Sequence, residues 1–149
     1  MLITPLTLRA FTLAQEAHRG QRDKGGHPYI EHVMFVANHV SGELATVVAL
    51  LHDVLEDTDM TTVDMEKSGI PARAIQSVSL LTRKPLEDYF AYIERIKSDP
   101  VAVEVKLADL QHNSDLSRIL YPSEYDKRRR EKYQRAIRAL SDKTRIRQD

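Results

Sequence analysis

The feature that most constrains this chain is a helical apolar stripe that runs directly into ionisable side chains. His52 and Asp53 lie within the stripe, where burying an imidazole and a carboxylate without partners would cost several kcal/mol. A metal ion or a tight hydrogen-bond network would offset this cost. The stripe has the i, i+3, i+4, i+7, i+11 spacing of a buried helix and consists of Leu44, Val47, Val48, Leu51 and Leu55. The sequence therefore predicts a buried helix with a polar site at its centre.

Helical periodicity continues along the rest of the chain and predicts an all-α fold. Near the N-terminus, one predicted helical face consists of Leu8, Phe11, Ala14, Gln15 and His18. Three of the five glycines and a proline make residues 20–28 an exposed loop. Further helices are expected at residues 29–40, 44–55, 63–67, 71–81, 86–97, 100–119 and 123–141. The tail at residues 143–149 is expected to fray.

One of these helices has a competing interpretation. Apolar residues alternate as in a β-strand at Val101, Val103, Val105 and Leu107. We favour a helix, because Asp99 followed by Pro100 is typical of an N-cap and a first helical turn. The later residues of the segment also keep helical spacing.

Composition narrows the class of protein. The chain has 149 residues, 42% of them hydrophobic, and no linker or repeat, so we expect one compact domain. Its 22 basic and 22 acidic residues balance, which argues against nucleic acid or an anionic membrane as the main partner. The absence of cysteine excludes thiolate zinc sites and cysteine nucleophiles and fits a cytoplasmic location. No apolar run is long enough to span a bilayer, and the N-terminus does not resemble a secretory signal.

Three carboxylates lie close together just after His52. Asp53, Glu56 and Asp57 stand at i, i+3 and i+4, so they line one side of about one helical turn. Carboxylates this close repel one another unless a cation or a shared proton is present. This spacing favours a cation site.

Residues from two other predicted helices can complete that site. His32 and Asp109 would add to His52 and Asp53, which gives two imidazoles and two carboxylates. This donor set suits Mn²⁺, Fe²⁺, Co²⁺ or Zn²⁺ better than Ca²⁺. Asn113 lies one turn beyond Asp109 and is expected to point toward the same cavity.

Three motif blocks stand in order along the chain. They are AHRGQRDKGGHPYIEH at residues 17–32, ALLHDVLEDT at 49–58 and VKLADLQHN at 105–113, with a KYxxAIxxL pattern at 132–140. In this order, they resemble the HD-domain metal-dependent phosphohydrolases. More narrowly, they resemble the hydrolase domain of RelA/SpoT-type enzymes, whose stand-alone form is the small alarmone hydrolase. The resemblance implies one HD-type helical bundle over residues 1–149, with the metal and catalytic motifs within residues 17–113.

The resemblance also implies roles for individual residues. One divalent ion, Mn²⁺, would be bound by His32, His52, Asp53 and Asp109. Glu56 and Asp57 match the acidic pair that positions or deprotonates the attacking water, and Lys24, Arg22 and Asn113 are the expected substrate contacts. The implied reaction is hydrolysis of the 3′-pyrophosphate of (p)ppGpp to GDP or GTP plus pyrophosphate, by water that the metal activates.

Other residues near the motifs have weaker assignments. Arg83, Lys106 and Arg118 are further candidates to meet phosphate charge. Tyr29 and His112 occupy motif positions in which they either pack or act. His18 is expected to be structural and to donate a hydrogen bond near the site.

Two positions depart from the family pattern, because Asp23 and Asp115 stand where basic nucleotide contacts are usual. The substrate therefore stays open between guanosine alarmones, adenosine alarmones and the 2′-phosphate of NADPH. A non-catalytic nucleotide-binding HD module is the alternative from another class, and the intact ligands and acidic pair argue against it.

The expected partner is a small nucleotide. The basic run at residues 126–132 is interpreted as a solvated helix face, and a homo-oligomer is left open.

Overall fold

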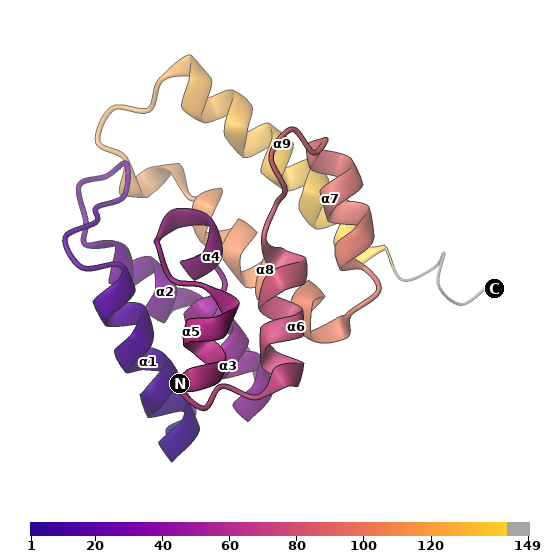
Figure 1. The fold of residues 1–149 in the computed structure, drawn as a ribbon. Helices are drawn as coiled ribbons and strands as arrows, with labels where there is room; N and C mark the ends of the chain where they lie inside the picture. Colours follow the sequence, from indigo (N-terminus) through magenta and orange to yellow (C-terminus); the bar gives the residue numbers. More distant parts are fainter. Residues whose placement is uncertain (143–149) are drawn as a thin grey trace.

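The computed structural model describes residues 1–142 and is helical throughout, with no β-strand in that range (Figure 1). The expected all-α class is confirmed, and the predicted tail at residues 143–149 lies outside the described part. The helices are α1 (Pro5–Ala17), α2 (Tyr29–Asn38), α3 (Glu43–Leu51), α4 (Val54–Asp57), α5 (Thr62–Lys67), α6 (Ala72–Leu81), α7 (Tyr89–Ile96), α8 (Pro100–Asn113), η1 (Leu116–Arg118) and α9 (Glu124–Ser141).

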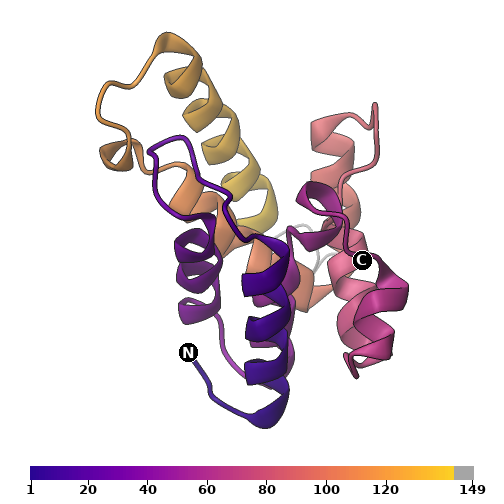
Figure 2. The ribbon, with the colours of Figure 1, turned by 60° about the vertical axis from the view of Figure 1, so that its left-hand side comes forward.

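Helix α3 lies at the centre of the core. Every residue from Ala45 to Leu51 is buried, and α3 packs against α1, α2, α6 and α8. In Figure 2, α1 stands in the foreground, with α2 to its left and α5, α6 and α7 to its right. Fully burying one Leu or Val side chain contributes about 1.5–3 kcal/mol to the stability of the fold. Because α3 buries several of them, it is firmly anchored, and it fixes the position of the residues that follow it.

The ambiguous segment at residues 100–113 is a helix, as the capping signal predicted. The Asp99 carboxylate accepts hydrogen bonds from the backbone N–H groups of Val101 and Ala102, and Pro100 occupies the first turn. Asp99 also binds Arg73 and Ser77 on α6. The cap therefore ties the start of α8 to a neighbouring helix.

The predicted single helix at residues 44–55 is wrong, because it breaks at His52 and Asp53. The His52 Nδ1–H donates to the carbonyl oxygen of Ala49 over 2.6 Å. In an uninterrupted helix that oxygen would accept the N–H of Asp53. The chain leaves α3 at this point and re-enters a short helix, α4.

Three smaller expectations also fail for local reasons. Helix α8 ends at Asn113 instead of residue 119, because the Asp115 side chain caps the separate 3₁₀ turn η1. Helix α7 begins at Tyr89 instead of residue 86, since Asp88 is its N-cap. On α1 the buried face consists of Thr7, Ala10 and Ala14, while Leu8 and Gln15 are exposed.

Among the described residues, no helix combines the length and the apolarity that crossing a bilayer requires.

Candidate active site

Four potential metal ligands converge at the middle of the molecule. One side-chain atom from each of His32, His52, Asp53 and Asp109 lies within 4.8 Å of all the others. His32 Nε2 is 2.9 Å from Asp109 Oδ1, and His52 Nε2 is 2.9 Å from Asp53 Oδ2. All four predicted ligands are therefore brought together, and the cluster could bind a metal ion.

The fold explains this convergence. His32 comes from the buried face of α2, and Asp109 comes from the buried face of α8. His52 and Asp53 lie at the break between α3 and α4, where the turn aims two consecutive side chains into one space. Helix α3 packs against both α2 and α8, and these two helices also contact each other, so the three sources meet within the core.

The protonation pattern of the two imidazoles fits a cation. Since His52 Nδ1 donates to Ala49, its Nε2 presents a lone pair to the cluster. His32 Nδ1 lies 2.7 Å from His112 Nδ1, which leaves His32 Nε2 facing the carboxylates. Both Nε2 atoms are buried and lack a well-directed hydrogen-bond partner. Two imidazole nitrogens without a hydrogen-bond partner thus lie beside two carboxylates. A divalent ion would be coordinated by all four groups.

The surrounding charges also call for a cation. Burial would lower the pKa of His52, but Asp53 and Asp109 outweigh it and raise that pKa well above its usual value. The two carboxylates thus draw a proton onto a buried imidazole when they have no other positive charge to pair with. A divalent ion would replace that proton.

Neighbouring side chains hold the ligand carboxylates in place. The Tyr29 hydroxyl donates to Asp53 Oδ2 over 2.5 Å. Lys106 Nζ donates to Asp109 Oδ2 over 2.8 Å, and Asn113 Nδ2 donates to Asp109 Oδ1 over 3.0 Å. Burial alone would raise the pKa of Asp109, but Lys106 and the two histidines hold it well below its usual range. Both ligand carboxylates are therefore kept ionised and oriented.

The acidic pair lies beside the ligands in a cleft of about 250 Å³. Glu56 and Asp57 line this cleft together with Asp53 and Asp109, and we call it the metal cleft. Burial, followed by the charge of Asp53, raises the pKa of Asp57. Burial also raises the pKa of Glu56, whose carboxylate accepts the backbone N–H of Arg83. A carboxylate with a raised pKa is a better proton acceptor near neutral pH.

A second cleft of about 310 Å³ continues from the first, because Tyr29, Asn113 and Tyr133 line both. We call it the loop cleft. It contains Arg22 and Lys24, so two of the predicted substrate contacts lie at this end, while Asn113 lies at the junction. Lys24 Nζ is 4.6 Å from the Tyr125 ring centroid and 4.0 Å from Asp126 Oδ1.

The loop cleft also shows the role of Asp23, an acid at a position where a basic residue is usual in the family pattern. Its carboxylate accepts N–H groups of Gly25 and His27 and pairs with Arg118 over 2.5 Å. A side chain at Gly25 would collide with the carbonyl oxygen of Arg118, so the two segments touch closely. Asp23 thus places an arginine from another part of the chain in this cleft. Asp115 instead caps η1.

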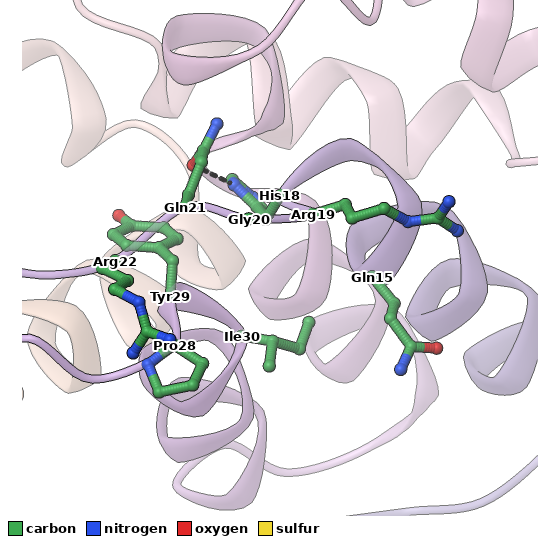
Figure 3. A pocket seen from close by; sticks show the side chains of 9 residues that line it. All are labelled: Gln15, His18, Arg19, Gly20, Gln21, Arg22, Pro28, Tyr29 and Ile30. Atoms are coloured by element: carbon green, nitrogen blue, oxygen red, sulfur yellow. Dashed lines mark hydrogen bonds between the residues drawn. The ribbon is translucent and has the colours of Figure 1, made fainter.

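A neighbouring cavity of about 500 Å³ is also lined by Tyr29 (Figure 3). None of the four ligands lines it. His18 Nδ1 is 2.9 Å from Gln21 Oε1, the contact dashed in Figure 3, and Gln21 Nε2 donates to the backbone carbonyl of Asp57. The expected hydrogen bond of His18 near the site is therefore present, and it acts through Gln21.

Sequence reasoning did not assign the supporting roles of Tyr29, Lys106 and His112. Tyr29 and His112 lie in the motif blocks, but from the sequence alone each could be either a packing residue or a functional one. Lys106 stands three residues before Asp109, and this i, i+3 spacing was the available signal for an ion pair. Its ammonium group pairs with a ligand, which differs from the phosphate contact considered for it.

Comparisons with known proteins agree with the motif blocks, although no family model matches the chain. The chain is 34% identical over 137 residues to the bifunctional (p)ppGpp synthase/hydrolase SpoT of Escherichia coli K12, which covers 82% of the chain and 19% of that protein. It is 36% identical over 133 residues to the guanosine-3′,5′-bis(diphosphate) 3′-pyrophosphohydrolase of Haemophilus influenzae, covering 79% of the chain and 19% of that protein. The chain thus spans about a fifth of the length of these curated relatives.

A solved structure has the same fold over nearly the whole chain. It is that of a metazoan ortholog of SpoT that hydrolyses ppGpp, with a TM-score of 0.79 and 24% sequence identity. The match covers 97% of this chain and 89% of that one. The expected resemblance to RelA/SpoT-type hydrolases and the expected helical fold are both confirmed.

Proposed function

We propose that this chain is a metal-dependent phosphohydrolase that removes the 3′-pyrophosphate of (p)ppGpp. The observation that carries the proposal is the buried cluster of His32, His52, Asp53 and Asp109, which opens into a cleft that also holds Glu56 and Asp57. The named relatives include 3′-pyrophosphohydrolases of this alarmone, which supports the choice of substrate.

The cluster would hold a single ion, and its imidazole and carboxylate donors suit several divalent metals. We assign Mn²⁺ because the resemblance to RelA/SpoT-type hydrolases implies it. A divalent ion there would lower the pKa of water and neutralise phosphoryl oxygens. Tyr29, Lys106 and Asn113 hold the ligand carboxylates in place, and Lys106 also helps to keep Asp109 ionised, so the site is organised before substrate arrives.

Glu56 accepts the proton of the attacking water, and Asp57 orients that water. The raised pKa values of both carboxyl groups support these roles. The water oxygen bonds to the phosphorus attached to the ribose, and the bond from that phosphorus to the 3′-oxygen breaks. The 3′-oxygen takes up a proton, so one water is consumed and the products are GDP or GTP and pyrophosphate.

The substrate spans both clefts. The 3′-pyrophosphate lies in the metal cleft, and the rest of the nucleotide lies in the loop cleft against Arg22, Lys24 and Arg118, with Asn113 between. The chain acts as one HD-type domain over residues 1–149 in the cytoplasm. Because Asp23 redirects Arg118 into the loop cleft, base preference is decided at this end.

The direct test is pyrophosphate release from guanosine 3′,5′-bis(diphosphate) with Mn²⁺ and then with excess chelator. We expect rapid release that the chelator abolishes. Failure to release pyrophosphate from a folded, metal-loaded sample would contradict the guanosine substrate, and adenosine alarmones and NADPH would then be assayed.

The role of Glu56 has its own test. Glu56→Gln should retain Mn²⁺ binding and lose roughly 10²–10⁴-fold in turnover, because the proton acceptor is gone. The matched control is Asp59→Asn, at an exposed acid just beyond α4. A wild-type rate in Glu56→Gln would rule out the assigned role.

A further inference from the structure

The metal cleft has two walls of opposite charge. One wall consists of the ligand carboxylates Asp53 and Asp109 and the acidic pair Glu56 and Asp57. The other carries Arg83, from the loop after α6, and Lys132, from α9. We call Arg83 and Lys132 the cationic wall.

Lys132 is a cation without an acidic partner in the part of the chain that the structure describes. Its Nζ lies 4.5 Å from the centroid of the Tyr89 ring and 5.4 Å from that of Tyr133. The side chain is half-buried. Burial lowers its pKa, and the positive charges of Arg83, Arg129 and Lys106 lower it further. An unneutralised ammonium among like charges costs free energy in the unliganded protein.

Arg83 is similarly uncompensated within the described residues. Its Nε and Nη2 donate to the backbone carbonyl of Glu87 over 2.9 and 2.7 Å, which orients the guanidinium but does not neutralise it. The guanidinium carbon lies 5.4 Å from the Tyr89 ring centroid, so both cations share one aromatic ring.

The third cation of the metal cleft is already paired, which distinguishes it from the cationic wall. Lys106 binds Asp109 at 2.8 Å. Arg95, which donates to the carbonyl oxygen of Thr82 next to Arg83, binds Glu87 at 2.7 Å. Among the described cations that line the metal cleft, Arg83 and Lys132 are thus the two that no carboxylate neutralises.

We propose that Arg83 and Lys132 bind the distal phosphate of a diphosphate whose proximal phosphate lies at the metal cluster. The cleft then selects a diphosphate ester over a monophosphate ester. The assignment deepens the proposed function and rests on it for the place of the proximal phosphate. A single phosphate at the metal cluster leaves the charges of the cationic wall unpaired, while a second phosphate pairs with them.

The test is calorimetric binding of inorganic pyrophosphate and inorganic phosphate to protein loaded with Mn²⁺ and freed of excess metal. The variants are Lys132→Gln and Arg83→Gln. Each should weaken pyrophosphate binding by roughly 10-fold or more, since each removes a charged contact. Phosphate binding should change by less than about threefold, because that anion stays at the metal cluster.

Two control variants keep the test sharp. Lys127→Gln removes a charge from the same helix, but Lys127 is exposed and pairs with Glu124, so its pyrophosphate affinity should equal that of the wild type. Lys132→Arg keeps the charge and should restore most of the affinity, which separates loss of charge from loss of fold. Circular dichroism checks that each variant is helical.

The outcomes distinguish this inference from the proposed function. Equal pyrophosphate affinity in wild type and Lys132→Gln overturns the inference, even if the protein hydrolyses ppGpp. Equal loss of phosphate and pyrophosphate binding also overturns it, because selection for the distal phosphate would be absent. Selective loss of pyrophosphate binding in a protein that releases none from ppGpp supports the inference and moves the reaction to another diphosphate.

Discussion

The two ends of the substrate cleft are built in different ways. At the metal cleft, His32, His52 and Asp109 are at most 3% exposed, and each makes a second hydrogen bond or ion pair. At the loop cleft, Arg22 and Lys24 are exposed and hold their positions through a backbone carbonyl and an aromatic ring. Changes at the first end disturb the core, whereas the second end can change with little effect on the fold.

This contrast has a functional reading. Phosphoryl chemistry needs ligands held at fixed geometry, and packing in the core supplies that. Recognition of a nucleoside can be altered by exchanging surface charges, as the pairing of Asp23 with Arg118 illustrates. The departures from the family pattern lie at the loop cleft, while the metal cleft retains every expected ligand.

The largest expected effect comes from removing a ligand at the metal cleft. His52→Ala should abolish stoichiometric Mn²⁺ binding and reduce turnover by roughly 10³-fold or more, because activation of water depends on the ion. Metal content after dialysis and initial rates measure both effects. An active variant with full metal content would show that the two ends are less different than their burial indicates.

A smaller effect is expected from a residue that supports a ligand. Tyr29→Phe removes the hydroxyl that donates to Asp53 and should weaken Mn²⁺ affinity or activity roughly 10–100-fold. Titration of Mn²⁺ against activity measures the change. Tyr121→Phe is the control, because Tyr121 is 86% exposed. If the two variants gave identical Mn²⁺ titrations, Tyr29 would not be a residue that supports a metal ligand.

At the loop cleft, Arg118→Gln should raise KM a few-fold and leave kcat nearly unchanged. The substitution removes a cation that we propose contacts the bound nucleotide, and it breaks a partly exposed ion pair worth about 0.2–1 kcal/mol. Steady-state kinetics separate the two constants. A large fall in kcat at unchanged KM would place Arg118 with the chemistry instead of with recognition.

The smallest effect on activity is expected at Asp99, the N-cap of α8, which lines neither cleft. Burial alone would raise the pKa of Asp99, but hydrogen bonds from Arg73 and Ser77 outweigh it and hold that pKa at about 2. Because the folded pKa lies below the ordinary value of 3.8, the ionised group contributes stability above that pH and loses it as pH falls toward 2.

Asp99→Asn should therefore lower the Tm at neutral pH, and the difference from wild type should shrink as the pH falls below about 4. Thermal melts at a series of pH values measure this. Activity at neutral pH should stay close to wild type while the protein is folded. A difference in Tm that stays constant down to low pH would show that the charge of Asp99 is not what stabilises the cap.

Sequence reasoning performed best where a signal was local. The cap formed by Asp99 and Pro100 decided correctly between helix and strand for α8. Periodicity predicted a helix at residues 29–40, where the structure has α2 with Val33, Val36 and Ala37 buried. It failed at His52, because a side chain competing for a backbone carbonyl leaves no trace in an apolar pattern. The assigned roles of Glu56, Asp57, Arg22, Lys24 and Asn113 stay predictions until the variants are measured.

By itself, the sequence determined the helical class, the identity of the four candidate ligands and the acidic pair beside two of them. The helical class and the acidic pair follow from spacing along the chain, which local hydrogen bonding and amphipathicity control. The set of four ligands is what the resemblance of the motif blocks implies. Only the tertiary structure decided which cations are neutralised. Lys106 and Lys132 are both lysines on helices, yet one lies against Asp109 and the other faces an open cleft. The spacing of Lys106 and Asp109 on α8 is a signal for their ion pair, but the place of Lys132 beside the cleft depends on how α9 packs against α8, which its position along the chain does not encode.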